Sequence, residues 1–161
     1  MKIIIIIISL FFVSSCGQTK DDTFTLDPSK PIEVGIESIG GDSQEVQIIN
    51  VYMINHQPVR GIQLKVTPNN FFQIDSVYGG RVQDSNFEIP YNKEGMILSY
   101  SLSGNSIPVS DSAIKDQNIL FKVLAKKINP FTGPVSLIPI LADSSAKKLD
   151  FVTSPFELIG N

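Results

Sequence analysis

The sequence contains few of the residue types from which catalytic and metal centres are built. Its 161 residues include one cysteine, one histidine and no tryptophan. A single cysteine cannot form an internal disulfide, and one histidine offers no His/Cys cluster for a metal. There is no G-x-S-x-G elbow that would present a nucleophilic serine. The composition therefore gives little support to a zinc site or to a hydrolase triad.

The remaining polar residues do not indicate a reaction either. His56 lies in a proline-containing loop at 55–58, where a surface histidine with ordinary partners is the simpler interpretation. Two carboxylates for glycoside cleavage stay open as an alternative, but no spacing singles out a pair. A D-x-D-x-D-G calcium loop is absent, and residues 143–145 (Asp-Ser-Ser) are typical of a turn, although calcium at the domain edge stays open. We expect no enzyme, no metal and no cofactor.

Long runs of positive charge are also missing. The formal net charge is −3 at pH 7, and the basic residues are scattered apart from the pairs Lys126-Lys127 and Lys147-Lys148. Phosphate binding requires a basic stripe or patch, which these pairs do not form. We therefore expect no nucleic-acid partner.

The only long hydrophobic run is at the N-terminus. After Lys2, residues 3–13 are almost entirely apolar, and Val13-Ser14-Ser15-Cys16 follows the pattern of a bacterial lipoprotein cleavage site. The run has about a dozen residues, whereas a membrane-spanning helix needs roughly 20. Residues 1–15 are therefore predicted to be a lipoprotein signal peptide.

The cysteine is the predicted site of lipid attachment. Acylation of Cys16 would anchor the protein firmly, because each buried methylene contributes about 0.8 kcal/mol, so we expect membrane contact through the lipid alone. Residues 16–30 are predicted to be the lipidated N-terminus and a polar tether. Residues 20–22 (Lys-Asp-Asp) resemble the export signal of Bacteroidetes surface lipoproteins, with an ordinary solvated tether as the alternative. The expected location is the outer membrane of a Gram-negative bacterium, with exposure at the cell surface.

From residue 31 to 161 the dominant hydrophobic period is two, which indicates strands with one buried face. Helical periodicity is almost absent. About nine such runs are separated by turn residues, which predicts an all-β, two-sheet β-sandwich with jelly-roll-like connections. The predicted strands are 32–36, 45–54, 62–66, 71–77, 87–91, 96–103, 119–125, 135–141 and 149–158.

Three local expectations follow from the same pattern. The strand at 45–54 is apolar on both sides and is expected to be central. Gly79-Gly80 is expected to form a turn or bulge, with no helix nearby. In 96–103 we expect Met96, Leu98, Tyr100 and Leu102 to point inward, and Ile97, Ser99, Ser101 and Ser103 to point outward.

The order of several short motifs between residues 45 and 151 resembles the cohesin domains. Residues 57–66 (QPVRGIQLKV) resemble a strand with the pattern V-x-G-I/F-Q-F, and 97–108 (ILSYSLSGNSIP) resemble a strand that ends in S-L-T-G-x-S-I-P. Further matches lie at 74–80 with Phe87, at 119–123, and at 141–145 with 149–151. The resemblance implies a cohesin-like β-sandwich over residues 31–161.

A cohesin resemblance implies a surface that docks a protein, because known cohesins hold calcium-bound dockerin modules on one flat sheet face. In this chain the third, fifth, sixth and eighth strands would build that face. The outward residues carried over as partner contacts are Gln63, Lys65, Glu88, Ser99 and Ser101. The alternative is that these are solvated outer positions of a sandwich.

A second functional hypothesis is a carbohydrate-binding module of a polysaccharide-capture lipoprotein. Such modules stack sugar rings on exposed aromatic side chains, which Tyr78 and Tyr91 could supply. The adjacent Phe71 and Phe72 would also place one ring outward if both lie in a strand. Core packing or covering of a sheet edge is the alternative for these aromatic residues. Both hypotheses describe a membrane-anchored, non-catalytic binding module.

Overall fold

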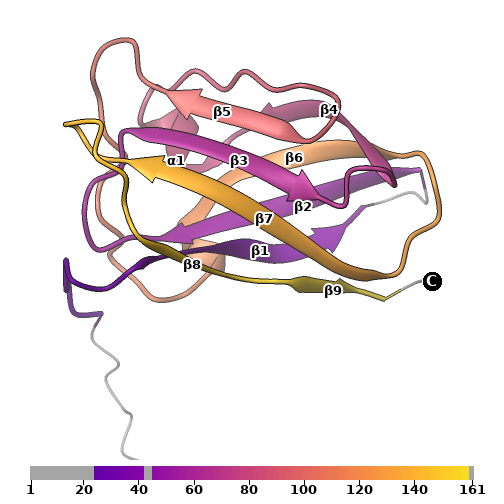
Figure 1. The fold of residues 1–161 in the computed structure, drawn as a ribbon, viewed down its shortest axis with the longest axis horizontal. Coiled ribbons are helices and arrows are strands. Elements are labelled where there is room, and N and C mark those ends of the chain that lie inside the picture. The colour runs from indigo at the N-terminus through magenta and orange to yellow at the C-terminus, as the bar shows by residue number, and fades with distance from the viewer. Residues whose placement is uncertain (1–23, 42–44, 160–161) are drawn as a thin grey trace, which may run out of the picture.

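The computed structural model describes residues 24–41 and 45–159, which form two facing β-sheets (Figure 1). The first sheet has the order β4-β6-β2-β1-β8. Its strands are β1 (Ile32–Gly40), β2 (Val46–Ile54), β4 (Phe72–Tyr78), β6 (Ile119–Lys127) and β8 (Phe151–Ser154). The second sheet has the order β5-β3-β7-β9. Its strands are β3 (Gly61–Thr67), β5 (Met96–Tyr100), β7 (Gly133–Ala142) and β9 (Phe156–Leu158). The predicted all-β sandwich is confirmed.

The core lies between the inner faces of the two sheets. Alternate residues of each strand enter it, as the period of two predicts. Burying one such aliphatic or aromatic side chain contributes about 1.5–3 kcal/mol. Fully buried members from both sheets include Ile32, Val34, Val51, Leu64, Ile97, Phe121, Val123, Val135 and Leu141.

β2 is central, as expected, since it pairs with β1 on one side and β6 on the other. Val51 enters the core, whereas Tyr52 lies on the opposite face and is still only 1% exposed. Gly35 on β1 makes room for the Tyr52 ring, because a Cβ at Gly35 would lie 2.6 Å from it. Lys115 covers the ring, with its Nζ 4.8 Å from the ring centroid. Tyr52 is therefore covered although it lies outside the core.

The number of strands agrees with the prediction, but two of the nine predicted segments behave differently. Residues 87–91 form only two isolated bridges, Glu88 to Tyr100 and Tyr91 to Ile97. Pro90 between them has no N–H to donate to a ladder. At the C-terminal end, one predicted strand is two, because Pro155 separates β8 from β9. β8 pairs with β1 in the first sheet and β9 with β7 in the second.

The expectation of no helix near Gly79-Gly80 is wrong, because a short helix, α1 (Gly80–Asp84), begins there. Gly80 has φ +64°, and a Cβ at this position would lie 2.5 Å from the Leu120 carbonyl oxygen. Glycine is therefore required where the helix starts. α1 has only one buried residue, Val82, and so produces no apolar period that a sequence could reveal. A 3₁₀ turn, η1 (Asp116–Asn118), precedes β6.

Residues 24–30, the end of the predicted tether, lie against the domain at His56. The Phe24 ring stacks on the imidazole with centroids 5.0 Å apart, and the Asp27 N–H donates to His56 Nδ1 at 3.2 Å. His56 is thus a partnered residue, as its surface interpretation expected. The predicted signal peptide, Cys16 and residues 20–22 lie outside the described residues. Within the described ranges, no helix has the length and hydrophobicity needed to cross a membrane.

Candidate functional site

The outer face of the second sheet carries an exposed apolar patch around one lysine. β3 lies at its centre, paired with β5 on one side and β7 on the other. Directly opposed residues share a face. Two rows therefore cross the three strands: Leu98–Gln63–Ile140 and Met96–Lys65–Ile138. Tyr100 extends the patch along β5. We call these seven residues the sheet face.

The aliphatic side chains of the sheet face are unusually open to solvent. Ile138 is 53% exposed and Ile140 is 47% exposed, on a strand whose inner residues are buried. Leu98 and Tyr100 on β5 are about as exposed, at 39% and 41%. Contiguous exposed apolar groups on a rigid sheet mark an interaction surface more often than isolated ones do.

The predicted inward and outward sides of β5 are reversed. Ser99 is 1% exposed and lies inside, whereas Leu98 and Tyr100 lie outside. The reason is pairing across the sheet: Leu64 is a core residue of β3, and Ile97 is its direct partner on β5. Ile97 must therefore enter the core, and Ser99 two residues later follows it. The prediction of Ser99 as a partner contact is wrong.

The other predicted contact residues lie at or near the sheet face. Gln63 and Lys65 stand at its centre, and exposed Glu88 lies at its margin beside Tyr100. Ser101 lies past the end of β5, where its Oγ accepts a hydrogen bond from the Asn105 N–H at 3.0 Å. This serine shapes a loop next to the face rather than the face itself.

The sheet face carries a single charged residue, and this residue has no ion-pair partner among the described residues. Lys65 is exposed and is the only charged residue among the seven. Among the described residues the one ion pair joins Lys115 to Glu33, at 3.5 Å, on the other sheet. Lys65 therefore has no carboxylate within ion-pair distance in the part of the chain that the structure describes, and its ammonium group can meet one from another molecule.

Sequence reasoning missed Ile138 and Ile140 as surface residues. A signal was present, because residues 137–141 are apolar without interruption (Leu-Ile-Pro-Ile-Leu). Such a run in a strand indicates that both faces of the strand are covered, either by the chain itself or by a binding partner. In this domain the inner face is covered by the core, and the outer face is open.

The two tyrosines of the carbohydrate hypothesis do not share a platform. Tyr91 donates its hydroxyl proton to the Asp75 carbonyl oxygen at 2.7 Å, so its ring covers the edge formed by β4. Tyr78 pairs with exposed Lys122 and faces outward from the first sheet. Each ring is 41% exposed. Tyr91 is therefore fixed at the edge of β4, whereas Tyr78 lies on the outer face of the same sheet.

Neither Phe71 nor Phe72 faces outward, and the alternative of core packing describes both rings. Phe71 is 6% exposed and Phe72 is 3% exposed. Phe71 precedes the first residue of β4, so strand alternation does not apply to it. Its ring stacks on Phe131 with centroids 4.5 Å apart and meets Phe72 edge-on at 4.7 Å. The pair closes one end of the core.

Residues 143–148 form the expected turn. Asp143 Oδ1 accepts hydrogen bonds from the Ser145 N–H at 2.8 Å and the Lys147 N–H at 2.9 Å. This carboxylate oxygen is occupied by backbone donors. Over residues 24–41 and 45–159, no group of three or more His, Cys, Asp or Glu residues is placed to hold a metal ion.

Comparisons with known proteins identify the fold. No protein-family model matches the sequence, and no curated protein matches it significantly. Among solved structures, a chain of the complex of CaDoc0917 with CaCohA2 from Clostridium acetobutylicum superimposes with a TM-score of 0.58 at 15% identity, over 81% of this chain and 99% of that one.

Two further structures carry the same fold. A non-cellulosomal cohesin from the archaeon Archaeoglobus fulgidus has a TM-score of 0.57 at 14% identity, over 81% of this chain and 93% of that one. The sixth cohesin of scaffoldin B from Acetivibrio cellulolyticus, solved with a dockerin, has a TM-score of 0.56 at 11% identity, over 82% and 100%. The domain has the cohesin fold, and at these identities the similarity concerns the fold alone.

Proposed function

We propose that this cohesin-fold domain is a non-catalytic docking module that binds a protein partner through the sheet face. The observation that carries the proposal is the exposed aliphatic patch of β5 and β7, which surrounds Lys65 on β3, a lysine with no ion pair among the described residues. A sheet of this kind is rigid before binding, so little conformational freedom is lost when a partner covers it. The Acetivibrio cohesin of the same fold was solved with a dockerin bound, which supports a partner of dockerin type.

The chemistry of the sheet face describes the matching surface of the partner. Two rows of aliphatic groups require an apolar stripe, and an amphipathic helix laid across the strands supplies one through residues three and four apart. A carboxylate on that helix would pair with Lys65, and a basic residue near its end would meet Glu88. The apolar centre would supply most of the affinity, and the charges would set orientation and partner choice.

We further propose that the module works at the cell envelope. The Val13-Ser14-Ser15-Cys16 motif supports a lipid anchor at Cys16 in the outer membrane. A lipid at the N-terminus and a docking face on the sheet would hold a protein partner at the surface of the bacterium. Detection of acyl chains on Cys16 by mass spectrometry, and their loss in Cys16→Ser, tests this part separately.

The docking proposal is tested by capturing exported proteins of the same organism on the immobilised domain, with calcium present. We expect Ile138→Ala combined with Ile140→Ala to weaken capture at least tenfold, because buried anchors dominate interface energies. The matched control is Val152→Ala on β8, a similarly exposed aliphatic residue on the other sheet. Equal capture by the double variant, the control and the parent protein would remove the sheet face from the proposal.

A further inference from the structure

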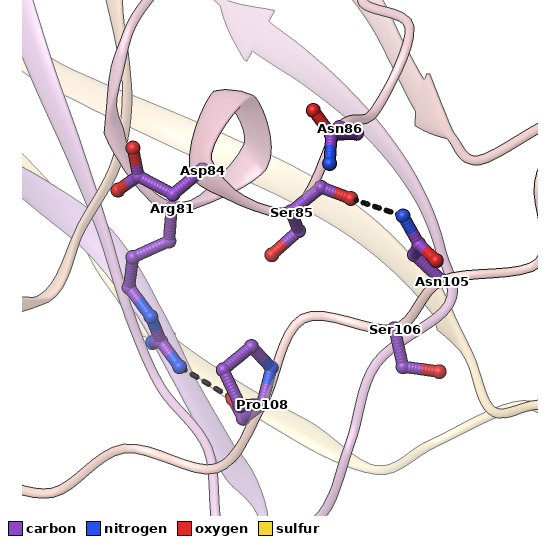
Figure 2. Close-up of a pocket in the computed structure, with 7 residues that line it drawn as sticks. All are labelled: Arg81, Asp84, Ser85, Asn86, Asn105, Ser106 and Pro108. Carbon is purple, nitrogen blue, oxygen red and sulfur yellow. Dashed lines mark hydrogen bonds between the residues drawn. The ribbon is translucent and has the colours of Figure 1, made fainter.

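A pocket opens at the end of the sandwich where β3 begins, beside the loop that follows Tyr100, and Figure 2 shows the residues that line it. It has a volume of about 480 Å³ and lies between α1 and the loop that leads to the buried bridge of Val59 with Ile107. Small-molecule sites in proteins commonly occupy about 300–1,000 Å³. Six polar or charged residues and one proline line it: Arg81, Asp84, Ser85, Asn86, Asn105, Ser106 and Pro108.

Arg81 joins the two walls of this pocket. From α1 its guanidinium donates to the Met53 carbonyl oxygen at 2.7 Å, to Ser110 Oγ at 3.1 Å and to the Pro108 carbonyl oxygen in the opposite loop. Figure 2 shows this side chain running along one side of the pocket to Pro108. Since the same group bonds both walls, their separation is set before any ligand arrives.

The rest of the frame is also held by hydrogen bonds. Asn105 Nδ2 donates to the Ser85 carbonyl oxygen at 3.0 Å across the other side of the pocket (Figure 2). Beneath it, Asn55 and Ser110 are at most 2% exposed and bond one another, and Asn55 Nδ2 donates to the Pro108 carbonyl oxygen at 2.8 Å. A connected polar network of this kind rigidifies the loops that it joins.

The charges at the pocket do not favour an ionic ligand. Arg81 has no carboxylate within ion-pair distance in the described residues, burial lowers its pKa, and its donors already serve backbone and side-chain oxygens. Asp84 adds a negative charge to the same lining. An anion would meet Asp84 and a cation would meet Arg81, so a neutral ligand suits the pocket best.

Several hydrogen-bonding groups of the lining are unused. In the part of the chain that the structure describes, the side chains of Asp84, Ser85, Asn86 and Ser106 make no hydrogen bond, and Asn105 has a free Oδ1. Figure 2 shows the Ser85 hydroxyl directed into the space between Arg81 and Asn105. Hydroxyls and amides both donate and accept, and a carboxylate accepts from two neighbouring hydroxyls. Vicinal alcohol groups present that pattern.

We propose that this pocket binds one neutral sugar residue of pyranose size, held by Ser85, Asn86 and Asn105, with the Pro108 ring against its less polar side. The site shares no residue with the sheet face, and the proposal does not depend on protein docking. A cohesin-fold domain would then carry a protein-binding face and a sugar pocket built from different residues.

The test is an NMR titration of the ¹⁵N-labelled full chain in a detergent without a sugar headgroup. Glucose, galactose, mannose, xylose and N-acetylglucosamine are each added up to about 50 mM, since a single sugar residue is expected to bind with a Kd on the order of 1 mM. The expected result is saturable shifts of backbone amides at 81–86 and 104–107 with at least one sugar. Absence of saturable shifts with all five sugars would overturn the proposal.

Two variants localise the effect. Ser85→Ala removes the hydroxyl that is directed into the pocket, and it is expected to weaken sugar binding about tenfold because a hydrogen bond to the ligand is lost. The matched control, Ser145→Ala, removes an exposed hydroxyl in the turn at 143–145 and is expected to bind like the parent protein. If sugar binding survives Ser85→Ala unchanged, the ligand lies elsewhere and the pocket assignment is wrong.

Discussion

The two outer sheet surfaces differ in how they are covered. Around β1 and β2, side chains of the same chain cover the outer surface. Tyr52 is buried under Lys115, and its hydroxyl donates to Glu33 Oε1 at 2.6 Å. Lys115 and Glu33 also form an ion pair. On the sheet face, the aliphatic side chains are exposed to solvent, and Lys65 has no ion-pair partner among the described residues. A surface that the chain leaves uncovered is the one available to another molecule.

The largest expected effect separates the two surfaces by stability. Tyr52→Ala should lower the free energy of unfolding by about 3 kcal/mol, because it empties a buried aromatic site. Tyr100→Ala, on the sheet face, should change it by no more than about 0.5 kcal/mol. Urea denaturation of both variants measures the difference. Similar losses for the two tyrosines would mean that the sheet face is part of the stabilising core.

The second prediction compares the same two surfaces by partner binding, where the sheet face should show the larger effect. Lys65→Glu should weaken capture of the docked partner about tenfold, because it places a negative charge opposite the expected carboxylate. Lys122→Glu makes the same charge change on the outer surface of the first sheet and should leave capture unchanged. Surface plasmon resonance at two salt concentrations checks both, since the loss in Lys65→Glu should shrink as salt rises. A stronger effect at Lys122 would move the docking surface to the other sheet.

The third prediction concerns pH and the covered surface only. Burial and the hydrogen bond to Glu33 raise the pKa of Tyr52 above its ordinary value of 10.0. A raised pKa means that the folded state favours the protonated phenol, so this stabilisation is complete below pH 10 and is lost as pH rises through the folded-state pKa. The pKa of Lys115 is also raised, by its contact with Tyr52, and acts in the same direction.

Unfolding free energies measured between pH 8 and about pH 11 test this sign. The parent protein should lose stability in the upper part of that range, and Tyr52→Phe should lose less because it has no phenol to ionise. Tyr100→Phe serves as the control on the open surface and should follow the parent protein. An identical decline in the parent and Tyr52→Phe would contradict the assignment.

The smallest expected effect lies beneath the sheet face. Ser99 Oγ is buried and has no hydrogen-bond partner within residues 24–41 and 45–159. Ser99→Ala should therefore leave stability unchanged or raise it by up to about 1 kcal/mol. Ser110→Ala, at an equally buried serine whose Oγ is hydrogen-bonded, should instead lower stability by about 1–2 kcal/mol. Thermal denaturation of the two variants makes the comparison, and a clear loss in Ser99→Ala would show that its hydroxyl has an undetected partner.

The sequence by itself determined the features that depend on near neighbours in the chain. The alternation at 32–36 and 62–66, the central place of 45–54 and the turn at 143–145 all follow from side-chain period and turn chemistry, which act over a few residues. The order of the short motifs between residues 45 and 151, which resembles that of the cohesin domains, indicated a cohesin-like sandwich. A five-residue helix such as α1 is too short to leave a period, and it was missed.

Only the tertiary structure decided which side of a strand faces inward and which distant loops meet. Residues 96–100 alternate in either sense, and it was the pairing of Ile97 with Leu64 that placed Ser99 in the core and Leu98 and Tyr100 outside. The polar pocket likewise requires α1 and the loop at 104–108 to be joined through Arg81. Such contacts form between residues far apart in sequence, and their energy depends on the partner that each side chain meets, which no local pattern specifies.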